Sequence, residues 1–86
     1  MGKQEVGWKR RLEDGTKREV LVRRVGGKWH FRERKGRYDP WKVVEAPSRE
    51  DWETLLDGVR RRYQRRGFTD GDVRAVERVI AELFSD

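Results

Sequence analysis

The sequence has no cysteine, one histidine and two serines. The absence of cysteine excludes disulfides, thiolate nucleophiles and cysteine-based zinc sites. His30 alone cannot build a metal cluster. Ser48 reads as a helix cap and Ser85 follows the last apolar residue, so neither has a base placed to activate it. No phosphate-binding or dinucleotide-binding glycine pattern is present. We therefore expect no enzymatic activity, no cofactor and no metal.

Long apolar runs are also missing. No stretch approaches the roughly 20 residues that cross a membrane, and the first residues lack the apolar segment of a signal peptide. We therefore expect a cytoplasmic protein that makes no membrane contact.

Charge dominates what is present. Charged residues make up 44% of the 86 residues and hydrophobic residues 34%, with a formal net charge of +6. Such a composition can signal disorder, but nine aromatic residues, four of them Trp, and regular apolar spacing predict a folded chain. Residues 1–46 carry +7 and residues 47–86 carry −1. We expect a single domain, 1–86, with a sheet part at about 5–45 and a helical part at about 48–85.

The apolar spacing changes at the same point as the charge. Apolar residues alternate before Ala46 and recur every three or four residues after Pro47. This order predicts an α+β fold, in which a three- to four-stranded antiparallel β-meander is followed by two C-terminal helices packed on one face. The expected strands are Glu5–Leu12, Arg18–Val25, Lys28–Arg34 and a short, less regular Lys42–Val44.

Loop lengths fix the predicted register. Gly26-Gly27 indicates a tight hairpin, since both positions of a type I′ turn need positive φ. Between the first two strands, a two-residue Asp14-Gly15 loop would scatter the apolar side chains over both faces. A three-residue loop, 13–15 with Gly15 left-handed, sets Trp8 opposite Val20 and gathers them on one face. Burial therefore favours the three-residue loop.

Both helices have marked starts. Ser48 with Asp51, and Thr69 with Asp72, have the spacing of a capping box. A first apolar stripe is expected to end at Gly67. The stripes consist of Trp52, Leu55, Leu56, Val59 and Tyr63, and of Val76, Val79, Ile80, Leu83 and Phe84.

Strand alternation places cations on the face away from the apolar side chains. The only acidic residues expected on this face are Glu5 and Glu19, and such a surface suits the phosphates of nucleic acid. Because most aromatics are expected on the apolar face, we predict contact with duplex DNA or RNA, and base stacking would fall to Tyr38 or Trp41. An ordinary solvated face is the alternative. The face carries Lys9, Arg11, Lys17, Arg23, Lys28, Arg32 and Arg34, with His30 and Leu21 among them.

A second basic cluster lies in the first predicted helix, Arg60–Arg62 with Arg65 and Arg66. Compensation of the helix dipole and an Asp57–Arg61 pair explain part of it. The other arginines of the cluster would extend the surface that contacts nucleic acid. The nucleic-acid-binding residues predicted from sequence are thus Lys9, Arg11, Arg23, Arg32 and Arg34, with Arg62, Arg65 and Arg66 as a second patch.

A protein-interaction module is the rival function. Tyr38, Pro40 and Trp41 form an aromatic and proline cluster of the kind enriched at interface hot spots. Together with the arginine-rich helix, it would dock an acidic protein partner. Alternatively, Trp41 covers the open end of a small core.

Overall fold

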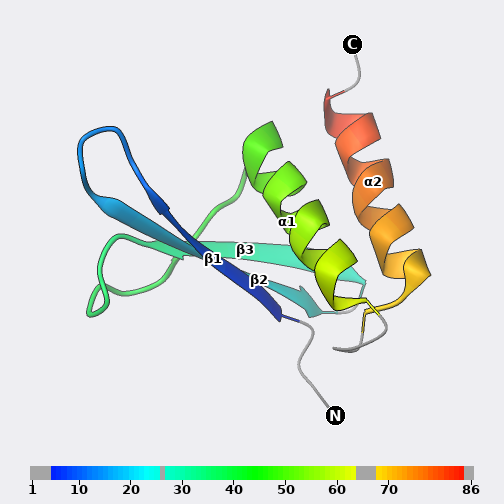
Figure 1. Cartoon of the computed structure of the whole chain (residues 1–86), viewed down its shortest axis with the longest axis horizontal. Helices are drawn as coiled ribbons and strands as arrows, with labels where there is room; N and C mark the ends of the chain where they lie inside the picture. The colour runs from blue at the N-terminus through cyan, green and yellow to red at the C-terminus, as the bar shows by residue number, and fades with distance from the viewer. Residues whose placement is uncertain (1–4, 26, 64–67, 85–86) are drawn as a thin grey trace. The chain divides into compact units, whose positions relative to one another are not determined.

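The computed structural model describes residues 5–25, 27–63 and 68–84, and it confirms the α+β class (Figure 1). Two compact units are present, a sheet unit Glu5–Ala46 and a helical unit that begins at Pro47, so the boundary falls where the apolar spacing changes. The single-domain organisation and the packing of the helices on the sheet stay predictions. The elements are β1 (Glu5–Arg11), β2 (Lys17–Val25), β3 (Lys28–Arg34), β4 (Lys42–Val43), α1 (Arg49–Arg62) and α2 (Asp70–Phe84).

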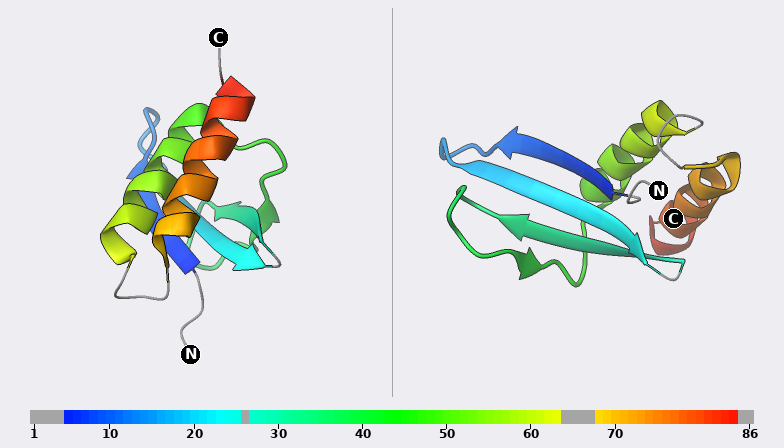
Figure 2. Two further views of the ribbon diagram at one scale, coloured as in Figure 1. Left: turned by 90° about the vertical axis from the view of Figure 1, so that its right-hand side faces the viewer. Right: turned by 90° about the horizontal axis from the view of Figure 1, so that it is seen from below.

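The sheet is an open antiparallel meander in the order β1-β2-β3-β4 (Figure 2). Trp8 lies opposite Val20, as predicted. The β1–β2 loop explains this register: the Leu12 N–H donates to the Thr16 carbonyl at 2.7 Å, and the Gly15 N–H donates to the Leu12 carbonyl at 3.0 Å. Gly15 has a φ of 89°, a conformation that side chains disfavour. The three-residue loop is confirmed.

The remaining strand connections also follow the sequence. Val25 lies opposite Lys28, and Gly27 has a φ of 79°, whereas Gly26 lies outside the described residues. The short fourth strand is present as Lys42–Val43, and the Val44 N–H donates to the Phe31 carbonyl at 2.9 Å just beyond it.

One face of the sheet is apolar at its centre. Val6, Val20, Val22 and Phe31 are each at most 2% exposed. Trp8 is half-buried and meets Phe31 edge-on, with ring centroids 6.5 Å apart. These positions share a face because directly opposed residues of antiparallel strands point the same way.

An arginine lies at each end of the apolar face. At one end the Arg24 guanidinium lies 5.5 Å from the ring centroid of the half-buried Trp29. At the other end Arg18 forms an ion pair with Glu33. Burial is thus confined to the middle of the strands.

In the helical unit, α1 and α2 lie side by side and run in opposite directions (Figures 1 and 2). Both predicted capping boxes are present. The Asp51 N–H donates to Ser48 Oγ at 3.2 Å, and the Asp72 N–H donates to Thr69 Oγ1 at the same distance. Both aspartates are buried at the positive ends of their helices, where a carboxylate is favoured. Neither described helix is long and apolar enough to cross a membrane.

The end of α1 differs from the prediction. The helix stops at Arg62 rather than at Gly67, because Tyr63 adopts an extended conformation with a ψ of 148°. Tyr63 forms a parallel bridge with Phe68, which is only 2% exposed. Pairing these two residues and burying Phe68 therefore competes with continuing the helix, and it leaves Tyr63 exposed rather than in the apolar stripe.

Candidate functional site

The second face of the sheet is strongly basic, as the register predicts. Its side chains alternate with the buried ones along each strand. It carries seven Lys and Arg side chains and two carboxylates, which together give a formal charge of +5. We call this surface the basic face; it consists of Lys9, Arg11, Lys17, Arg23, Lys28, Arg32 and Arg34, with Glu5 and Glu19.

Each carboxylate of the basic face is engaged by one arginine. Arg23 Nη2 lies 2.6 Å from the Glu5 carboxylate, and Arg34 Nε lies 2.8 Å from the Glu19 carboxylate. Lys9 stands directly opposite Glu19 in the register, but the pair that forms is Glu19–Arg34. In the described part of the chain, five cations of this face have no ion pair: Lys9, Arg11, Lys17, Lys28 and Arg32.

The segment beyond β3 adds apolar groups to the same face. Val43 lies opposite Arg32 and is 68% exposed. Trp41, two residues earlier, lies under Arg34, whose guanidinium carbon is 4.4 Å from the ring centroid. Arg34 is therefore held from two sides, by the Glu19 carboxylate and by the Trp41 ring.

A hollow of about 480 Å³ opens at one end of the basic face. Five of its lining residues are cations, and its single carboxylate, Glu19, is already bound by Arg34. We call it the basic hollow; it is lined by Lys9, Lys17, Glu19, Arg34, Lys35, Gly36 and Arg37.

Gly36 and Arg37 belong to a tight turn. The Asp39 N–H donates to the Gly36 carbonyl at 3.1 Å and closes the turn. Tyr38, the next residue after Arg37, is 91% exposed. An exposed aromatic side chain thus directly follows, in the sequence, a cation of the basic hollow.

A smaller hollow of about 240 Å³ lies at the other end of the basic face, lined by Leu21, Arg23, Val25, His30 and Arg32. His30 is exposed there, as the strand alternation predicts. Its lining combines the aliphatic Leu21 and Val25 with the cationic Arg23 and Arg32.

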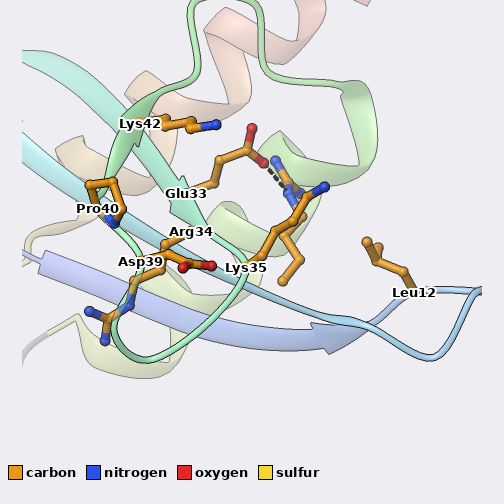
Figure 3. A pocket seen from close by; sticks show the side chains of 8 residues that line it. Leu12, Glu33, Arg34, Lys35, Asp39, Pro40 and Lys42 are labelled. Carbon is orange, nitrogen blue, oxygen red and sulfur yellow. Dashed lines mark hydrogen bonds and ion pairs between the residues drawn. The ribbon is translucent and has the colours of Figure 1, made fainter.

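A pocket of about 560 Å³ opens between the end of β3 and the loop that follows it (Figure 3). Arg18 and Glu33 form an ion pair in its wall, and Lys42 lies opposite Glu33 on the same side of the sheet. Both charge signs line it, so it shows less preference for anions than the basic hollow. Its lining residues are Leu12, Arg18, Glu33, Arg34, Lys35, Asp39, Pro40 and Lys42.

The described arginines of the second basic cluster, Arg60–Arg62, bind neighbours within the helical unit. Arg60 pairs with Glu77 and Arg61 pairs with Asp57, each at 2.8 Å; the second pair has the i,i+4 spacing expected from the sequence. Arg62 Nη1 donates to the Gly58 carbonyl at 3.2 Å. Arg65 and Arg66 lie outside the described residues.

Sequence reasoning missed Lys35 and Arg37 of the basic hollow and the contact between Arg34 and Trp41. Extending the strand alternation through the short fourth strand would have placed Trp41 near Arg34, since Val43 lies opposite Arg32. Nothing in the spacing of the irregular segment reveals the position of Arg37.

No family model, curated protein or solved structure matches the chain. Function therefore has to be inferred from the geometry and charge of the basic face.

Proposed function

We propose that this chain is a non-catalytic binding domain whose basic face contacts the phosphate backbone of nucleic acid. The observation that carries the proposal is the group of five cations on one exposed sheet surface without a carboxylate partner in the described residues. Each phosphate that such a cation neutralises releases condensed counterions, and this release drives binding. Contact through the backbone requires no base recognition and accommodates duplex DNA or RNA.

The alternative of a merely solvated face explains the charge pattern less well. A solvated sheet surface is stabilised by cross-strand pairs of opposite sign, and like charges directly opposite each other are destabilising. Arg11 lies directly opposite Lys17 on the basic face. A bound polyanion relieves the repulsion between Arg11 and Lys17, so these positions favour a ligand.

An acidic protein partner is the second candidate. The observation that favours it is Tyr38, which is 91% exposed and follows Arg37 of the basic hollow in the sequence. Exposed tyrosines with neighbouring arginines are typical of interface hot spots. This candidate predicts that a short acidic peptide binds the face, whereas duplex nucleic acid binds it only weakly.

Titration of labelled duplex DNA and duplex RNA tests the proposal. We expect saturable binding to the wild type, and the Lys17→Glu variant should weaken it by about tenfold or more at about 50 mM salt, since one contact is replaced by a repulsion. Arg61→Glu changes the net charge equally, but Arg61 pairs with Asp57 in the helical unit and serves as the control. Dissociation constants above about 1 mM at that salt, or equal losses in both variants, would refute the proposal.

A further inference from the structure

The turn 36–39 carries an exposed aromatic residue that directly follows, in the sequence, a residue lining the basic hollow. Gly36 and Arg37 line the hollow, and Tyr38 follows Arg37 directly, so its Cα lies about 3.8 Å from the Cα of a lining residue. The hydrogen bond from the Asp39 N–H to the Gly36 carbonyl closes this turn. The 91% exposed side chain of Tyr38 makes little contact with the rest of the chain, so packing does not account for the ring.

The basic hollow itself has the composition of a phosphate site. Lys9, Lys17, Lys35 and Arg37 form no ion pair among the described residues. Arg34, the remaining cation, is held by Glu19 and Trp41, which fixes its guanidinium at the site before a ligand arrives. Pre-organised donors bind an anion without the cost of ordering a long side chain.

A phosphate site beside an exposed ring distinguishes between two forms of nucleic acid. In a duplex the base faces are stacked on one another, so the ring reaches only sugar and phosphate. In a single strand the base faces are free, and stacking them on aromatic side chains is the general mode of single-strand recognition. The pairing of Tyr38 with the basic hollow suits an unpaired strand.

We infer that the loop 35–41 binds an unpaired segment of nucleic acid, with a backbone phosphate in the basic hollow and an adjacent base stacked on Tyr38. The inference rests on the proposed function, because it adds the stacking of one unpaired base to the backbone contacts that the basic face makes. It also revises the expectation from sequence, which favoured a duplex because aromatics were expected on the apolar face. Tyr38 and Trp41 are two aromatic residues that lie outside the apolar face.

The test compares three ligands on the full chain: an oligothymidylate, an abasic strand of the same length and charge, and a duplex. We expect the wild type to bind the oligothymidylate at least about fivefold more tightly than the abasic strand, the factor that corresponds to stacking one base weakly. Tyr38→Ala should remove this difference and leave duplex affinity unchanged. Tyr38→Phe should retain it, because the ring is kept, and Val43→Ala, another exposed apolar side chain of the face, should also retain it.

The outcomes separate the two proposals. Equal affinity for the oligothymidylate and the abasic strand, or a Tyr38→Ala variant that keeps the preference, overturns the stacking inference while nucleic-acid binding stands. Absence of binding to all three ligands overturns the proposed function and the inference with it. Since Tyr38 is so exposed, its substitution should not alter folding, and an unchanged thermal midpoint verifies this.

Discussion

The salt dependence of duplex binding should report which cations touch phosphate, and Arg32→Gln provides the sharpest case. Arg32 lies in the third strand opposite Leu21 and Val43, is exposed, and forms no ion pair within the described residues. Its removal therefore leaves no carboxylate newly unpaired. Each phosphate neutralised contributes about −0.9 to the slope of log affinity against log salt for a duplex.

The five unpaired cations set the size of the effect. If all five neutralise a phosphate, the slope is about −4.5, and affinity falls about 500-fold between about 50 and 200 mM salt. Loss of the Arg32 contact reduces the slope to about −3.6 and the fall to about 150-fold. At about 100 mM salt the variant should bind about eightfold more weakly than the wild type.

Fluorescence anisotropy of a labelled duplex at several salt concentrations measures the affinity and the slope of log affinity against log salt. The matched control is Arg61→Gln, which removes the same charge from an exposed arginine that already pairs with Asp57. We expect the control to leave the slope unchanged. An unchanged slope in Arg32→Gln, or the same reduction in both variants, would show that net charge rather than the basic face governs binding.

Three further predictions concern the framework of the site. Gly15→Ala should cost about 1–2 kcal/mol in urea unfolding, because φ is 89° there, whereas Gly7→Ala, in ordinary strand conformation, should cost less; equal costs would contradict the backbone argument. Ser48→Ala should cost about 1 kcal/mol through loss of the capping bond, and a thermal midpoint equal to that of the wild type would contradict it. The Thr16 hydroxyl and N–H hold the pKa of Asp14 below its ordinary value. The hydrogen bonds from Thr16 to the Asp14 carboxylate therefore stabilise the fold at neutral pH, and this stabilisation is lost as the pH falls through the lowered pKa. In Thr16→Val the pKa of Asp14, followed by NMR, should rise towards its ordinary value; no change would refute the assignment.

The regular half of the site could be predicted because a strand has a period of two. Once burial selects the three-residue loop ending at Gly15, Trp8 must face Val20, and every odd-numbered residue of the first strand must lie on the opposite face. The whole basic face follows from that one choice, with Lys9 and Arg11 as its first members. The helix starts could be predicted for a similar reason, since a capping box is a local pattern.

The irregular half could not be predicted from the same rules. Residues 35–41 have no period, so neither the turn that exposes Tyr38 nor the position of Arg37 follows from spacing. The contact of Arg34 with Trp41 depends on where the chain returns to pair Val43 with Arg32. The end of the first helix was missed because the bridge between Tyr63 and Phe68 is a tertiary interaction that overrides local helix preference.

The basic face and the buried face are two consequences of one register, which limits how either can change. A shift of one residue between the first two strands would carry Val6 and Trp8 to the solvated side and bring Lys9 onto the apolar side. The burial of Val6, Val20, Val22 and Phe31 therefore stabilises the display of cations on the other side, including pairs such as Arg11 and Lys17 that repel each other. Repulsion of this kind does not stabilise the fold, and a bound anion would release it, so the unpaired cations support the proposal of an anionic ligand.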